Sequence, residues 1–124
     1  MKNKNQLPTN TEIKSFEMLD ELSTSIYIEM KEFSKKKPDD ALNPFKVKNV
    51  NRVLIQIKEF LADQPTVAFL DLLDDEILPS NSDAILIIGQ FKAAMDNFRK
   101  KYQNNYRKWK TVEDPDGNTN FWDF

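Results

Sequence analysis

The side chains that could do chemistry in this chain of 124 residues are carboxylates, hydroxyls and amines, because it contains no cysteine and no histidine. Their absence removes thiolate nucleophiles, imidazole acid–base catalysis and the usual zinc ligands. With only 2 glycines, the chain also lacks the means to build glycine-rich phosphate loops or dinucleotide-binding turns. The composition therefore predicts a protein that is not an enzyme and that holds no metal or cofactor.

An acidic run is the best candidate for metal chemistry, at the end of a short predicted helix. Three of its carboxylates have the i, i+3, i+4 spacing that shares one helix face. Magnesium can bind through one or two carboxylates together with water and substrate phosphate, so a carboxylate-only divalent-metal enzyme is an alternative function. Solvated surface acids are the simpler interpretation. The run consists of Asp71, Asp74, Asp75 and Glu76.

Two further groups contain the residue types of a site without its spacing. Gly117 stands fourth from Asp114, whereas a calcium loop needs glycine at the sixth position, so this segment predicts a plain Asp-Gly turn. Hydroxyls gather near the middle of the first predicted helix, but none of them begins a Ser-x-x-Lys pair that could supply an activating base. These hydroxyls belong to Ser23, Thr24, Ser25 and Tyr27.

The most basic stretch runs from Phe98 to Lys110, where cations alternate with aromatic rings. Such a strip can neutralise phosphates and stack bases, so nucleic-acid binding is a second alternative function. The net charge of -2 argues against nucleic-acid binding by bulk charge. On a helix, Phe98, Tyr102, Tyr106 and Trp109 would share one face, which suits core packing better than base stacking. The cations are Arg99, Lys100, Lys101, Arg107, Lys108 and Lys110.

The leading prediction is a small helical module that binds a protein partner or a second copy of itself, in a regulatory, adaptor, immunity or phage-related role. Met18 and Ile28 are candidate contacts because they lie off the main apolar stripe of the first helix. The other candidates are the tail rings Phe121, Trp122 and Phe124, which could instead fold back over an apolar patch of the same chain.

The Asp123-Phe124 ending resembles the acidic, phenylalanine-terminated tips of bacterial and phage single-strand-binding proteins, which dock into partner pockets. The resemblance covers only these last residues, and no family is inferred from it.

Helical spacing of apolar residues predicts the elements that position these groups. A capping box at Thr9 to Glu12 opens a first helix that ends before Pro38. A second helix should begin at Asn43-Pro44 and run to about Asp63. A short third helix is expected from Val67 to Ile77. Residues 80–83 can cap the longest helix, whose apolar positions run from Ala84 to Trp109. A strand is the competing interpretation of residues 84–89.

We therefore expect an all-α fold: an antiparallel up-down bundle of about four helices with an irregular C-terminal tail. The bundle domain should span residues 11–110, after a flexible N-terminal segment (1–10) and before an acidic and aromatic tail (111–124). No apolar run is long enough for a secretory signal or a membrane span, which predicts a cytoplasmic protein with no membrane partner.

Overall fold

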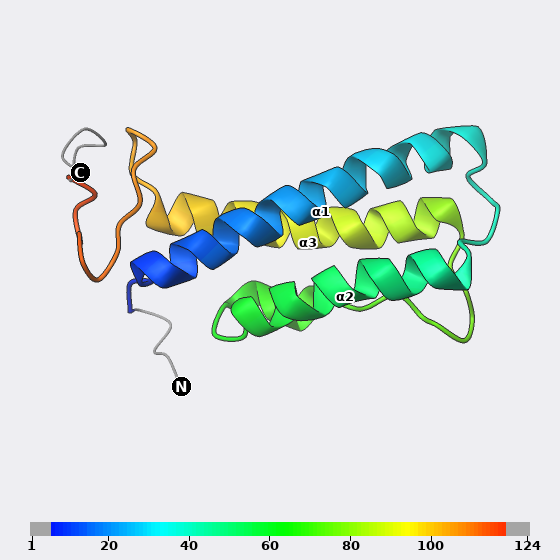
Figure 1. Ribbon diagram of the computed structural model, residues 1–124, viewed down its shortest axis with the longest axis horizontal. Helices are drawn as coiled ribbons and strands as arrows, with labels where there is room; N and C mark the ends of the chain where they lie inside the picture. Colours follow the sequence, from blue (N-terminus) through cyan, green and yellow to red (C-terminus); the bar gives the residue numbers. More distant parts are fainter. Residues whose placement is uncertain (1–5, 119–124) are drawn as a thin grey trace.

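The computed structural model describes residues 6–118, which form three α-helices and one short 3-10 helix. In chain order these are α1 (Asn10–Lys36), α2 (Pro44–Phe60), η1 (Pro65–Phe69) and α3 (Asn81–Tyr102) (Figure 1). Within residues 6–118 there is no β-strand, and the all-α prediction is confirmed. The competing strand over residues 84–89 is wrong, because these residues lie in the first turns of α3.

Side-chain caps set the start of each α-helix. At α1 the Thr9 hydroxyl accepts a hydrogen bond from the Glu12 amide, and the Glu12 carboxylate accepts one from the Thr9 amide, each 3.1 Å long. At α2 Asn43 Oδ1 accepts from the Lys46 amide (2.8 Å), and at α3 Ser80 Oγ accepts from the Asp83 amide (3.1 Å). Each cap satisfies an amide that has no partner inside its helix, so all three starts are encoded locally.

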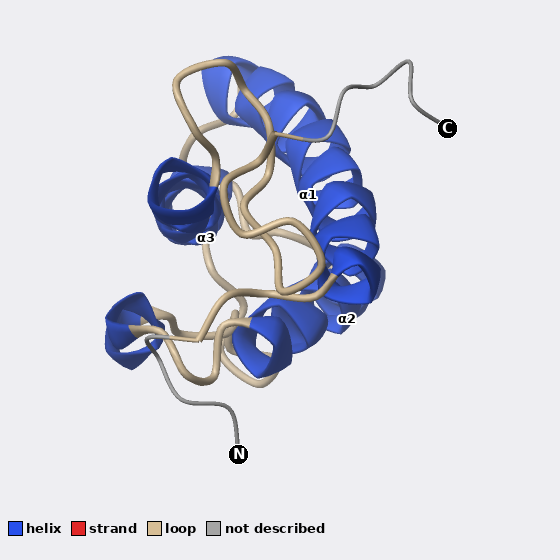
Figure 2. Ribbon diagram, turned by 90° about the vertical axis from the view of Figure 1, so that its left-hand side faces the viewer, coloured by secondary structure: helices blue, strands red, loops and turns tan. Residues whose placement is uncertain are grey.

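The three helices enclose one core, and α2 and α3 both run antiparallel to α1 (Figure 1). The end of α1 lies beside the starts of the other two, since the Asn81 side chain donates to the Lys37 carbonyl and the Leu42 amide to the Pro79 carbonyl, both at 2.8 Å. Viewed from the end of the bundle at which α1 begins, the three helices do not lie in one layer (Figure 2). The largest fully buried side chains include Phe16, Phe91, Leu54, Ile57, Ile88 and Met95.

The predicted four-helix arrangement is wrong at one point, because no α-helix forms between Val67 and Ile77. The 3-10 helix η1 ends at Phe69, and residues 70–78 are non-helical. The Asn51 side chain of α2 binds the backbone of Leu73 instead. Its Oδ1 accepts a hydrogen bond from the Leu73 amide and its Nδ2 donates one to the Leu73 carbonyl, both at 2.9 Å. An extended segment therefore returns the chain along the bundle, so α2 and α3 are parallel to each other.

The predicted last helix is also too long, because α3 ends at Tyr102 rather than Trp109. Asn104 Oδ1 accepts from the amides of Tyr106 (2.9 Å) and Lys108 (3.0 Å), which stabilises a turn in place of helix. The chain then reverses, and the Lys110 amide donates to the Tyr102 carbonyl at 2.7 Å. Residues 103–118 fold across this end of the bundle (Figure 2).

None of the helices in this part of the chain is both long and apolar enough to cross a lipid bilayer.

Candidate functional site

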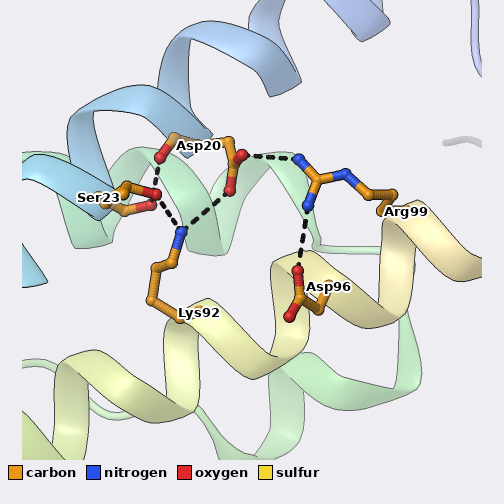
Figure 3. Close-up of polar contacts among 6 residues, drawn as sticks. Asp20, Ser23, Lys92, Asp96 and Arg99 are labelled. Atoms are coloured by element: carbon orange, nitrogen blue, oxygen red, sulfur yellow. Dashed lines mark hydrogen bonds and ion pairs between the residues drawn. The ribbon is translucent and has the colours of Figure 1, made fainter.

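A cluster of charged side chains joins α1 to α3 (Figure 3). Asp20 on α1 binds two cations from α3, Lys92 Nζ at 3.2 Å and an Arg99 guanidinium nitrogen at 2.7 Å. Arg99 also binds Asp96 at 3.1 Å, and Lys92 donates to the Thr24 hydroxyl. The sequence contained no signal for this cluster, because Lys92 is 68 positions from Thr24 along the chain.

The electrostatics of this cluster are satisfied from within. Partial burial works against the ionised form of Asp20, but the hydrogen bonds from Arg99 and Lys92 outweigh it and hold the pKa of Asp20 below its ordinary value. Lys92 Nζ donates to both the Asp20 carboxylate and the Thr24 hydroxyl. The buried Ser23 hydroxyl donates to the Asp20 carbonyl at 3.1 Å. The cluster is an ion-pair clamp between two helices.

The acidic run does not lie on a helix, so its carboxylates do not share the helix face that their spacing predicted. Asp74 Oδ1 accepts from the amides of Ile77 (2.9 Å) and Glu76 (2.8 Å), and these two hydrogen bonds lower the pKa of this exposed carboxyl. Asp71 and Asp75 are exposed on the same segment. Among residues 6–118, no three acidic side chains come together in a group that could hold a metal ion.

The segment at Asp114 forms a turn in which the Gly117 amide donates to the Asp114 carbonyl at 3.1 Å. Gly117 has a φ of 67°, a conformation that glycine adopts without the usual steric cost.

Because α3 ends at Tyr102, the basic and aromatic strip from Phe98 to Lys110 lies partly on α3 and partly in the turn after it. Lys100 and Lys101 follow Arg99 in the last turn of α3, whereas Arg107, Lys108 and Lys110 lie in the turn beyond it. Arg99 is held by two carboxylates of the bundle. The cations therefore do not share one helix face.

The single face of four rings predicted for this strip is wrong. Phe98 and Tyr102 are buried, and Trp109 packs its ring 5.2 Å from that of Phe16 after the chain has reversed. Tyr106 instead points into solvent and is 84% exposed.

The outer seam between α1 and α2 is hollowed at two places, which together are called the groove. It has two hollows, of about 670 Å³ and about 210 Å³, and both are lined only by residues of these two helices. The larger hollow is lined by Ser15, Met18, Leu19, Arg52, Ile55, Gln56, Glu59 and Phe60. The smaller is lined by Ile26, Glu29, Met30, Phe33, Phe45, Lys46, Asn49 and Val50.

Large apolar side chains remain exposed along this groove. The exposed fraction is 50% for Met18 and 42% for Ile55, which line the larger hollow, and 75% for Phe45 in the smaller one. Leu22, one helical turn after Met18, is 44% exposed. Clustered apolar side chains on a protein surface mark places where another molecule binds.

The two predicted contact residues of the first helix are separated by the fold. Met18 lies in the groove, whereas Ile28 is 59% exposed and lines neither hollow. Ten residues of helix place Ile28 about 80° around α1 from Met18. The same signal that picked out Met18, an apolar residue off the main stripe, would have picked out Ile55 on the second helix. The remaining predicted contacts, Phe121, Trp122 and Phe124, lie outside the described residues.

Comparison of the chain with models of known protein families, with curated proteins and with solved structures finds no match. The fold and the groove alone therefore define its class: an all-α domain whose described part packs three α-helices and leaves an apolar seam open between two of them.

Proposed function

We propose that this protein is a non-enzymatic binding module that docks a protein partner in the groove between α1 and α2. The observation that carries the proposal is the line of exposed apolar side chains at Met18, Leu22 and Ile55. The main apolar stripes of both helices already fill the core, and these residues lie outside it with about half of their surface exposed.

The composition of the groove supports a protein as the bound molecule. Apolar side chains line it together with Arg52, Glu59, Glu29 and Lys46, which add charge of both signs. An apolar centre with a polar, charged rim is the usual anatomy of a protein–protein interface. A groove between two helices is also a common seat for the apolar face of a further helix.

Such a module would act in a regulatory or adaptor role by holding its partner rather than by changing it. The ion-pair clamp at Asp20 supports that role mechanically, because it holds α1 against α3 and leaves the opposite side of α1 free to form the groove with α2. The tail rings Phe121, Trp122 and Phe124, which lie outside the described residues, remain candidate contacts of a protein partner.

Site-specific photo-crosslinking tests the proposal. A benzophenone amino acid replaces Ile55 in the groove, in cells that make the protein naturally, and a matched variant carries it at Leu86, an apolar residue of α3 that is 62% exposed and does not line the groove. We expect a protein adduct at position 55 that is absent at position 86. Equal adducts at both positions, or none at position 55, would contradict the proposal.

A further inference from the structure

The outer face of α2 carries a charge pattern that identifies what fills the groove, an inference that rests on the proposed function. Four exposed residues of this face line the larger hollow: Arg52, Ile55, Gln56 and Glu59. Arg52 and Glu59 stand about 10 Å apart along the helix axis, too far to pair with each other. In the described part of the chain, neither of them takes part in an ion pair.

A helix face with a cation at one end and an anion at the other is complementary to itself when two copies run antiparallel. Arg52 and Glu59 have the same midpoint along the chain as the neighbours Ile55 and Gln56. A twofold axis through that point therefore sets Arg52 of each copy against Glu59 of the other, and Ile55 of each against Gln56 of the other. An isologous interface requires this self-complementarity of a single patch.

We propose that the groove binds a second copy of this chain, with the two α2 helices packed antiparallel across a twofold axis between Ile55 and Gln56. Met18 of each α1 lines the same hollow, Leu22 follows one helical turn later, and both would be covered by the second copy. Two α1–α2 pairs then meet at the interface in a four-helix arrangement.

The balance of charge also permits this association. The net charge of -2 per chain gives little long-range repulsion between copies. The two ion pairs lie on either side of the Ile55–Gln56 contacts, where opposite charges fix register and orientation more than they add affinity. The pairing therefore predicts one specific dimer geometry rather than nonspecific association.

Charge-reversal variants test this geometry directly. R52E places two acids on the face and E59R places two arginines, so each variant alone meets its own copy with like charges at both edges. A mixture of the two variants restores opposite charges at both edges. The control K31E makes the same change of net charge as R52E at an exposed residue of α1 that lies outside the groove.

Sedimentation equilibrium of the full chain from about 1 to 200 µM gives the dissociation constant of the dimer, with circular dichroism to confirm that each variant is helical. We expect the wild type and K31E to form dimers with equal constants. R52E and E59R alone should each weaken dimerisation by about tenfold or more. Their equimolar mixture should recover a heterodimer within about threefold of the wild-type constant.

Three results would overturn the inference: a wild-type chain that is monomeric throughout, a dimer insensitive to both reversals, or a mixture that fails to recover association. The mass of the photo-adduct at position 55 distinguishes failure of the dimer proposal from failure of the proposal that the groove binds a protein. An adduct of twice the chain mass supports the second copy, and an adduct of any other mass keeps the groove as a binding site while excluding self-association there. No adduct overturns both.

Discussion

The side chain of Asn51 should be worth more to stability than any other exposed or half-buried amide on α2, because it holds the extended segment that stands in place of a predicted helix. Its amide nitrogen and oxygen bind the carbonyl and amide of Leu73, both at 2.9 Å. Leu73 is only 3% exposed, so water cannot readily replace either partner. Replacing Asn51 with alanine removes both hydrogen bonds and leaves two buried backbone groups without partners.

The expected loss follows from those two groups. Each stranded backbone group costs about 1–3 kcal/mol, and partial entry of water into the space left by the amide favours the lower end, so N51A should lose about 2–4 kcal/mol of unfolding free energy. For a domain of this size that corresponds to a fall of roughly 8–16 °C in Tm. N51D keeps the shape but sets a carboxylate against the Leu73 carbonyl, and should lose at least as much.

Urea denaturation followed by circular dichroism measures the loss, with N49A as the matched control. The Asn49 amide donates only to the Phe45 carbonyl of its own helix, at an exposed position, so its removal should change the unfolding free energy by less than about 0.5 kcal/mol. Hydrogen exchange at the Leu73 amide should accelerate in N51A. A loss below about 1 kcal/mol in N51A, with unchanged exchange at Leu73, would refute this account of the segment.

Three further predictions concern the clamp, the glycines and the basic strip. Because the pKa of Asp20 is lowered in the folded state, its contribution is present above the unfolded value and is lost as the pH falls through the folded pKa. D20N should therefore cost about 1–2 kcal/mol at neutral pH, and this cost should shrink progressively as the solution is acidified through the folded pKa. Urea titrations across this range check it, and a cost independent of pH would contradict it. In thermal melts G117A should destabilise by about 1–3 kcal/mol. The backbone at this position has a positive φ, and the added Cβ would lie 2.7 Å from Asn104 Nδ2 and 3.2 Å from two backbone carbonyl oxygens. G89A, at a helical position where the Cβ meets only the Tyr27 ring at 3.7 Å, should instead stabilise by about 0.5–1 kcal/mol; destabilisation by G89A equal to that of G117A would show that the glycine geometry is wrong. Titration of labelled single-stranded DNA over a salt series should show no steep salt slope, whereas a slope that disappears on changing Lys101 and Lys108 to glutamate would establish the nucleic-acid alternative.

Local signals along the chain are sufficient for the three α-helices and their starts. Thr9, Asn43 and Ser80 each bind an amide three residues ahead, and the apolar residues that follow them recur at helical spacing. Both kinds of information lie within a few residues of where they act. The absence of histidine and cysteine is likewise a property of composition, and it limits the chemistry of the chain to carboxylates, hydroxyls and amines.

Local signals fail where a distant residue competes for the same backbone. Leu70, Leu73 and Ile77 have helical spacing, but the bond to Asn51, 22 positions away, holds Leu73 in an extended segment. Trp109 has the spacing of a last helical turn, yet the Asn104 turn carries it back to the ring of Phe16. In both places an apolar residue reaches the core by a route that its periodicity does not encode.

The sequence by itself determined an all-α chain, where its helices begin and which side chains are available for chemistry, because capping and amphipathic spacing act over one or two helical turns. Only the tertiary structure decided that α2 and α3 run parallel, that Asp20 meets Lys92 and Arg99, and that Met18 and Ile55 share a groove. Those arrangements depend on contacts between residues tens of positions apart, and such contacts are chosen by the packing of the whole chain.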